Sequence, residues 1–101
     1  MPEEFRLTMT SALILEAVGA GHAYGFDIMD ATGLPSGTVY PALRRLEQLE
    51  LVRSKWEGTQ KALSEQRPAR KYYKLTSRGE AALSKASERY SVLQRPPGNQ
   101  R

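Results

Sequence analysis

Hydrogen-bonding side chains gather within residues 36–45, where they could contact phosphate groups and the edges of bases. The hydroxyls of Ser36 and Thr38 come first, the phenol of Tyr40 follows, and the guanidinium groups of Arg44 and Arg45 come last. On one face of a helix, short hydroxyls, an aromatic ring and two arginines suit the DNA major groove, which is about 12 Å wide. A solvated pair of surface arginines is the alternative interpretation of Arg44 and Arg45, and Arg45 lies nearer the edge of this face.

The apolar residues of the same stretch predict the helix that would carry these groups. Val39, Leu43 and Leu46 follow the spacing i, i+4, i+7, with Ala42 and Leu49 beside them. This pattern indicates an amphipathic helix over about residues 35–50, with one face in a core and the other outside. A proline within this helix, at position 41, removes one backbone hydrogen bond, so we expect a kink or a loosened first turn.

Two further helices are expected before this one. The stretch over about residues 8–20 is apolar on more than one side, so it needs two packing partners. A second, short helix should run over about residues 24–31 and end at Thr32 and Gly33. The chain therefore begins with three helices in succession.

A hairpin and a fourth helix should follow. Residues 51–57 alternate polar and apolar side chains, and residues 71–75 form a second such run, so both are predicted strands, with Trp56 expected in the core. Residues 58–70 are polar and predict a loop. Ser77, with Glu80 three residues on, predicts the capping box of a helix whose first turn Gly79 weakens.

This order of elements predicts a mostly α fold with a small two-stranded β wing. We expect a winged helix-turn-helix domain over residues 1–76, a dimerisation helix over residues 77–93 and a disordered tail over residues 94–101. The dimerisation helix carries a narrow apolar stripe of Leu83, Ala86, Tyr90 and Leu93. The first helix has more apolar surface than one face can cover, so we expect both to contribute to a dimer.

The distribution of charge agrees with a nucleic-acid partner. The formal net charge is +4, but residues 1–34 carry one arginine against five acids, whereas residues 35–101 carry fourteen basic residues against six acids. The basic surface thus belongs to the half that holds the proposed reading helix, as a nucleic-acid footprint requires.

The composition argues against several other classes of protein. The absence of cysteine excludes disulfides and thiolate metal sites. Because His22 is the single histidine, we predict no metal site, no cofactor and no catalytic group, and therefore no enzyme. No signal peptide and no run of 18 apolar residues is recognisable, so we expect a soluble, cytoplasmic chain without a membrane partner.

A closer resemblance rests on a set of motifs. These are residues 24–28 (YGFDI), 32–34 (TGL), 37–47 (GTVYPALRRLE) and 67–73 (RPARKYY), then Leu75-Thr76 with Gly79. Over about residues 13–83 the chain resembles the PadR-type transcriptional repressors. The resemblance implies a dimer that binds pseudo-palindromic operators, and many members repress detoxification or efflux genes until a small molecule binds. The chain departs from the pattern at Phe26, where the family often has tyrosine, and in having a single C-terminal helix.

Together the residues and the resemblance define candidate sites. The DNA-binding candidates are Tyr24, Ser36, Gly37, Thr38, Tyr40, Pro41, Arg44, Arg45, Arg67, Arg70 and Lys71, and the dimer candidates are Leu13, Leu83, Ala86, Tyr90 and Leu93. The basic residues near the hairpin could instead protect an exposed strand edge from aggregation. A small hydrophobic or aromatic effector is a further candidate partner, for which Tyr90 is the aromatic residue of the last helix.

Two functions remain open at this point. The first is a homodimeric, sequence-specific DNA-binding regulator that acts as a repressor. The alternative is a winged-helix protein-interaction module without specific DNA binding. Only the first should lose affinity for DNA steeply and linearly in a plot of log affinity against log salt.

Overall fold

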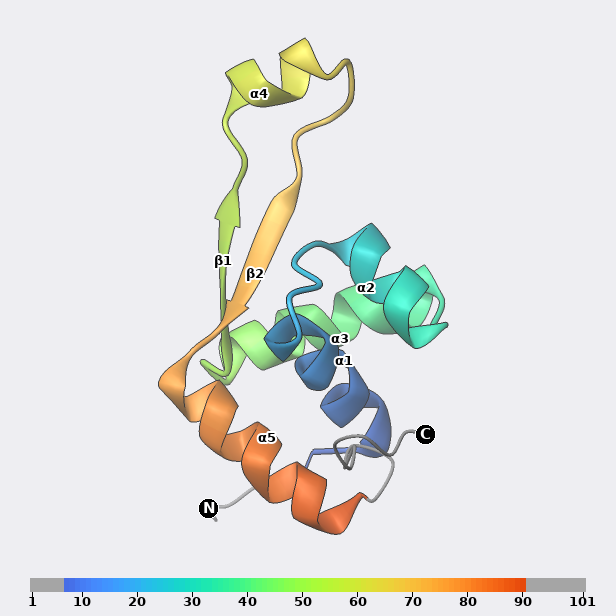
Figure 1. Ribbon diagram of the computed structural model, residues 1–101, viewed down its shortest axis with the longest axis vertical. Coiled ribbons are helices and arrows are strands. Elements are labelled where there is room, and N and C mark those ends of the chain that lie inside the picture. Colours follow the sequence, from blue (N-terminus) through green and yellow to red (C-terminus); the bar gives the residue numbers. More distant parts are fainter. Residues whose placement is uncertain (1–6, 91–101) are drawn as a thin grey trace, which may run out of the picture.

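The computed structural model describes residues 7–90 and contains the expected order of three helices, a hairpin and a last helix (Figure 1). One additional short helix lies between the two strands. The elements are α1 (Met9–Gly19), α2 (Gly25–Thr32), α3 (Ser36–Gln48), β1 (Val52–Trp56), α4 (Thr59–Ser64), β2 (Lys71–Leu75) and α5 (Ser77–Arg89). The predicted mostly α fold with a small two-stranded wing is confirmed.

The core lies where the first three helices meet. Ile14 and Leu15 of α1, Ile28 of α2, and Val39 and Leu43 of α3 are all 0% exposed. Helix α1 contacts α2, α3, α5 and β2. It therefore has the several packing partners that its apolar surface requires.

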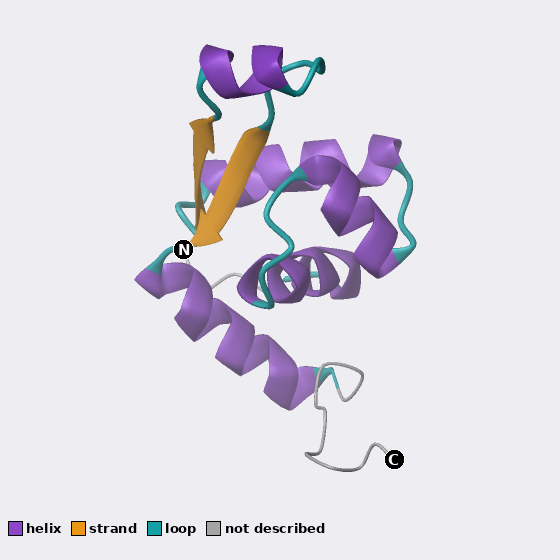
Figure 2. Cartoon of the chain, turned by 45° about the horizontal axis from the view of Figure 1, so that its top comes forward, coloured by secondary structure: helices purple, strands orange, loops and turns teal. Residues whose placement is uncertain are grey.

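The two strands form an antiparallel hairpin that projects from the helices (Figures 1 and 2). Its register pairs Val52 with Leu75 at the base and Trp56 with Lys71 at the outer end. The hairpin is tied to the body because Tyr73 N donates to Ala23 O over 2.7 Å. We call residues 52–75 the wing.

The prediction of a loop over residues 58–70 was wrong for its first half. Helix α4 forms there, and Ala62 is buried at 4% exposure. Lys61 and Glu65 pair at the i, i+4 spacing, and the backbone N–H of Arg67 donates to Ala62 O. A short polar helix of this kind is stabilised by contacts within its own turns. The spacing of apolar residues in the sequence does not reveal such contacts.

The start of α5 also differs from the predicted capping box. The N-cap is Thr76, whose Oγ1 accepts a hydrogen bond from Gly79 N at 2.9 Å. Ser77 is instead the first helical residue. Thr76 is favoured because its hydroxyl also donates to Glu50 O, which joins the start of α5 to the turn between α3 and β1.

Helix α5 packs against α1 of its own chain. Ala86 is 2% exposed in this packing, and the hydroxyl of Tyr90 donates to Leu7 O at 2.8 Å. Two of the predicted dimer residues therefore serve contacts within the chain. Leu13 and Leu83 are half-buried against the core, whereas Leu93 and the predicted tail lie outside the described residues.

No helix within residues 7–90 combines the length and the apolar character needed to cross a membrane.

Candidate nucleic-acid interface

The turn between α2 and α3 fixes the direction of the proposed reading helix. Gly33 ends α2 in the left-handed conformation at φ 75°, and its N–H donates to Met29 O. Thr32 braces the turn because its hydroxyl donates to Ile28 O and accepts from Leu34 N. Pro35 then occupies the N-cap position of α3 in an extended conformation.

Helix α3 has the two faces that its sequence predicts. Val39 and Leu43 are 0% exposed and Leu46 is 1% exposed, so the inner face belongs to the core. The other face consists of exposed residues, namely Ser36, Gly37, Tyr40, Pro41, Arg44, Arg45 and Gln48, and Thr38 is half-buried at its edge. The helix continues through Pro41 to Gln48. Six of the predicted DNA-binding residues on this helix are thus exposed together.

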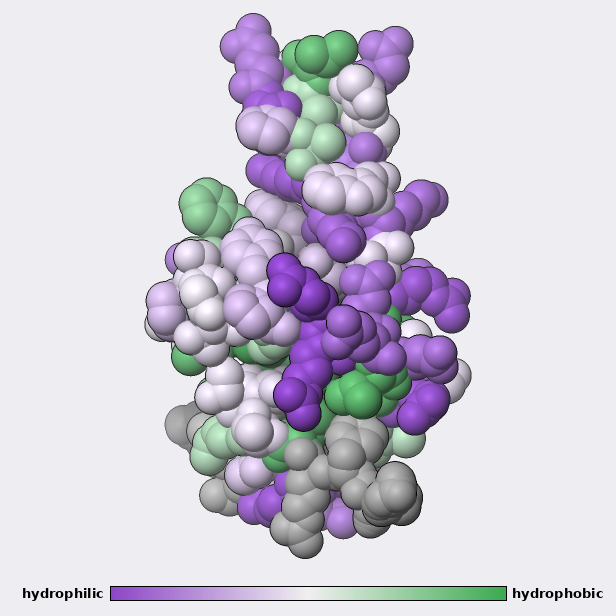
Figure 3. All heavy atoms as spheres, turned by 180° about the vertical axis from the view of Figure 1, so that it is seen from behind, coloured by the Kyte–Doolittle hydropathy of each residue, from purple (hydrophilic) through white to green (hydrophobic). Residues whose placement is uncertain are grey.

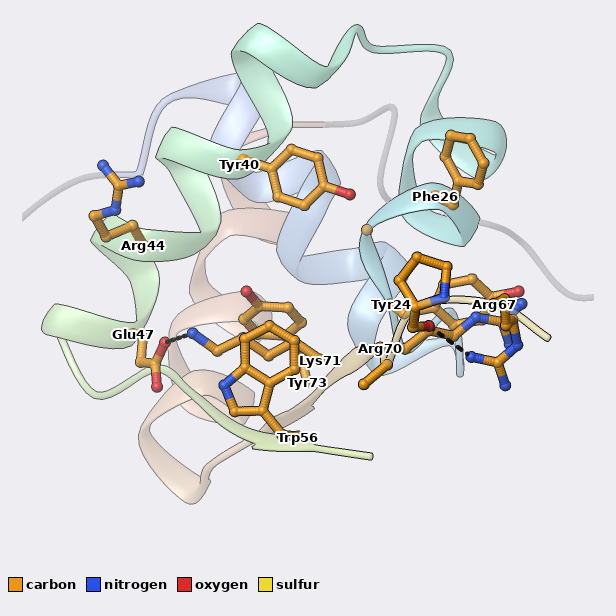
Figure 4. Close-up of a pocket in the computed structure, with 13 residues that line it drawn as sticks. Tyr24, Phe26, Tyr40, Arg44, Glu47, Trp56, Arg67, Arg70, Lys71 and Tyr73 are labelled. Carbon is orange, nitrogen blue, oxygen red and sulfur yellow. Dashed lines mark hydrogen bonds and ion pairs between the residues drawn. The ribbon is translucent and has the colours of Figure 1, made fainter. Parts of the chain in front are cut away.

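A groove of about 640 Å³ separates this outer face from the wing (Figure 4). Its walls combine aromatic rings with basic groups. The aromatic residues are Tyr24, Phe26, Tyr40, Trp56 and Tyr73, and the basic residues are Arg44, Arg67, Arg70 and Lys71. We call this space the wing groove. Rings that pack on sugars and bases, beside cations that attract phosphates, suit a nucleic-acid strand.

Arg44 stands at the edge of the wing groove, with its guanidinium group directed away from Glu47 (Figure 4). Among the described residues it has no ion-pair partner, and it is exposed. An exposed, unneutralised guanidinium can donate to a phosphate or to a base edge without first breaking an internal bond.

Lys71 is held differently. Its ammonium lies 3.8 Å from a carboxylate oxygen of Glu47, and it stands over the rings of Trp56 and Tyr73 at 5.7 and 5.9 Å. Trp56 is 63% exposed, so the prediction that it belongs to the core was wrong. It lies at the outer end of the hairpin, where its ring forms part of the wall of the wing groove instead of packing into the core.

Arg67 and Arg70 also have internal contacts. Both terminal nitrogens of Arg67 donate to Glu57, at 2.7 and 2.8 Å, and its side chain is only 18% exposed. The hydrogen bonds from Arg67 lower the pKa of the Glu57 carboxyl from 4.5 to about 2, and the same ion pair raises the pKa of Arg67. Arg70 stacks over Tyr24, with its guanidinium carbon 4.1 Å from the ring centre.

Three residues of this region could not be singled out from the sequence: Glu47, Glu57 and Tyr73. Tyr73 is 9% exposed, and burial raises the pKa of its phenol. Glu47 accepts a hydrogen bond from the hydroxyl of Ser54 on β1 and so links α3 to the wing. The sequence did not single out the two glutamates, because an isolated glutamate cannot be told from an ordinary surface charge until its partners are known.

Hydrophilic side chains cover most of the wing and continue onto the body (Figure 3). A hydrophobic group stands out at the tip, where Leu63 of α4 is 68% exposed. Within residues 7–90 no three His, Asp or Glu side chains are grouped so as to hold a metal ion. His22 is paired with Asp27 at 3.2 Å.

The comparison with protein families decides the affiliation of the chain. The Transcriptional regulator PadR-like family matches residues 14–85, which is well over half of the sequence. The chain belongs to the PadR-like family. Regulators of this family are generally not enzymes. A search of curated proteins gave no significant match.

Solved structures of two PadR proteins and of one further DNA-binding protein have the same fold. A PadR-like transcription factor from Bacteroides fragilis is 33% identical, with a TM-score of 0.68 over 84% of this chain and 82% of the other. A PadR family regulator from Clostridium difficile R20291 is 26% identical, with a TM-score of 0.71 over 85% and 91%. Bordetella bronchiseptica BpsR, whose DNA binding is regulated by 6-hydroxynicotinic acid, is 20% identical, with a TM-score of 0.70 over 92% and 65%, and shares the fold alone.

Proposed function

We propose that this PadR-like chain is a homodimeric, sequence-specific DNA-binding repressor. The observation that carries the proposal is the exposed outer face of α3, where Arg44 has no acidic partner among residues 7–90 and adjoins the wing groove. Helix α3 would enter the major groove, and the wing would contact the flanking backbone or minor groove. Such a protein acts in the cytoplasm, where the operator lies.

The candidate residues divide into two roles. Arg44 and Tyr40 on the outer face of α3, and Thr38 at the edge of that face, would read base edges, because this helix would enter the major groove. Arg70 and Lys71 would contact phosphates from the wing, whose geometry offers no bidentate reading of a base. Arg67 is engaged with Glu57 and Glu65, so the proposal gives it a structural role in the wing instead of a phosphate contact.

Dimerisation is part of the proposal. A two-fold dimer would place two copies of α3 roughly 34 Å apart, one turn of duplex DNA, and so match a pseudo-palindromic operator. Leu13, Leu83 and Tyr90 are predicted interface residues that are only partly buried within one chain. The hydroxyl of Tyr90 is already bonded to Leu7 O, so the two leucines are the better candidates for the interface. Release by a small hydrophobic or aromatic effector stays a prediction.

The test starts from the purified chain and sheared genomic DNA. Fragments that co-purify with the protein are sequenced, and binding to an enriched fragment and to a random fragment is titrated with salt. We expect a shared inverted repeat, a mass of two chains in light scattering, and a steep linear loss of log affinity with log salt. Absence of enrichment together with a flat salt response would overturn the proposal in favour of a protein-interaction module.

A further inference from the structure

One carboxylate closes the wing at the point where the strand ladder ends. Glu57 follows β1 directly, and its side chain is only 5% exposed. It accepts hydrogen bonds from both terminal nitrogens of Arg67, from Arg70 N at 3.1 Å and from the hydroxyl of Tyr72 at 3.3 Å. All the donors come from residues 67–72, so this single group fastens the outgoing arm of the wing to the returning arm.

The backbone extends the same junction. The last register pair of the hairpin joins Trp56 to Lys71, and one step further out Glu57 N donates to Arg70 O at 2.7 Å. Beyond this step the arms diverge into α4 and the turn after it (Figure 1). Glu57 is therefore the outermost side chain that holds both arms in one geometry before α4.

The fastened segment carries the wing's proposed phosphate contacts, Arg70 and Lys71. Arg70 lies over the ring of Tyr24, and Tyr24 meets Tyr72 edge to face with ring centres 5.7 Å apart. Because the hydroxyl of Tyr72 reaches Glu57, the contacts form a closed chain from the carboxylate back to Arg70. The position of the Arg70 guanidinium is thus set by groups that Glu57 orders.

We infer that Glu57 is a positioning residue for DNA binding, which presets Arg70 and Lys71 on the wing. The inference rests on the proposed function, because it assumes that the wing contacts phosphates. A side chain that is already ordered loses less conformational entropy on binding than a mobile one. An acidic residue beside a DNA-binding surface would in this way strengthen the binding of a polyanion.

The direction in which Glu57→Gln changes the affinity for DNA distinguishes this inference from a purely electrostatic effect. Glu57→Gln removes a negative charge and releases the charge of Arg67, so charge alone predicts tighter DNA binding. If Glu57 positions Arg70 and Lys71, its replacement should instead weaken DNA binding. We expect Glu57→Gln to bind every DNA sequence about 3- to 10-fold more weakly near 0.1 M salt, with the salt slope reduced by about 0.9 for each phosphate that the wing no longer neutralises.

The chain offers a matched control in Glu65→Gln. Glu65 accepts hydrogen bonds from Nε and one terminal nitrogen of the same Arg67. Its side chain is 46% exposed, however, and it reaches neither Arg70 nor Tyr72. The substitution removes the same charge from the same wing. We expect its affinity for DNA to be unchanged or slightly higher, with an unchanged salt slope.

A double-mutant cycle tests whether Glu57 acts through the two basic residues. In the Arg70→Ala/Lys71→Ala background, Glu57→Gln should have no further effect on affinity, because the groups that it positions are gone. Thermal unfolding of each variant, followed by circular dichroism, checks that the fold persists at the temperature of the binding assay.

The outcomes are distinct for the two proposals. A wild type that selects a shared inverted repeat and binds it with a steep salt slope upholds the proposed function, whatever Glu57→Gln does. Given that binding, a Glu57→Gln variant as tight as wild type overturns the positioning role. An undiminished effect of Glu57→Gln in the Arg70→Ala/Lys71→Ala background also overturns it, since Glu57 would then act on the fold alone.

Discussion

The phenol ring of Tyr40 on α3 occupies the space that a side chain at Gly25 would need. A Cβ at position 25 would overlap the hydroxyl oxygen and two ring carbons of Tyr40, closer than real Cβ atoms ever approach other atoms. Figure 4 shows the phenol directed from α3 toward the start of α2. Gly25 thereby sets the orientation of a residue that we assign to DNA reading.

Replacing Gly25 with alanine should therefore disturb binding more than folding. Tyr40 is 44% exposed, so its ring can swing aside, and the better helix propensity of alanine offsets part of the remaining strain. We expect a change in unfolding free energy below about 1 kcal/mol, with about tenfold weaker operator binding because the displaced phenol no longer meets the DNA. If Tyr40 is the cause, Gly25→Ala should add nothing to Tyr40→Ala in the same binding assay.

Gly37 offers the complementary case, a glycine for which residues 7–90 provide no steric reason. A Cβ there would meet no atom within 4 Å, and its φ is not in the left-handed region. Gly37→Ala should stabilise the fold by up to about 1 kcal/mol in thermal unfolding, because alanine is the better helix former. On the outer face, however, the new methyl group would stand against the DNA, so we expect weaker binding. Binding equal to that of wild type would show that DNA does not approach this turn closely.

The two arginines of α3 should differ in what they contribute. Arg44 borders the wing groove, whereas Arg45 does not. We expect Arg44→Ala to cost about 1 to 3 kcal/mol on the selected operator and little on random DNA. Arg45→Ala, the matched control, should weaken both DNAs by a similar and smaller amount. Equal effects on both DNAs for Arg44→Ala would make Arg44 a phosphate contact.

Local periodicity was enough to predict the helices other than α4, the hairpin and the exposed face of α3. Spacing such as that of Val39, Leu43 and Leu46 reports directly on which side of a helix is buried, and the structure confirms it. The position of Trp56 and the role of Glu57 were not predictable in this way. Both depend on partners 10 or more residues away, at Arg67 and Lys71, whose proximity only the folded hairpin creates.

Gly79 shows how such a distant partner changes the interpretation of a residue. Its sequence context indicates only a weak first helical turn, yet a Cβ at this position would collide with the backbone oxygen of Leu51. Backbone cannot move aside as the ring of Tyr40 can. Gly79→Ala should therefore destabilise the chain by about 1 to 3 kcal/mol, although helix propensity alone predicts a gain of nearly 1 kcal/mol. Chemical denaturation measures the difference, and Ser77→Ala, at an exposed position in the same turn, serves as the control. A more stable Gly79→Ala variant would contradict the close approach of α5 to Leu51.

The ion pair of the wing should be visible in the pH dependence of stability. Arg67 lowers the pKa of Glu57 to about 2 in the folded chain, against an ordinary value of 4.5. A carboxyl whose pKa is lowered by folding stabilises the fold fully above its unfolded pKa, and this contribution is lost as the pH falls toward the folded pKa. The difference in melting temperature between wild type and Glu57→Gln should thus be constant from pH 8 to about pH 6, and it should shrink between about pH 4.5 and pH 2. Arg67 also lowers the pKa of Glu65, and the Glu57 charge acts on it as well. The same comparison made in a Glu65→Gln background therefore isolates Glu57. Melting curves that stay equally far apart down to pH 2 would show that Glu57 does not titrate with a lowered pKa, and that its ion pair with Arg67 is absent in solution.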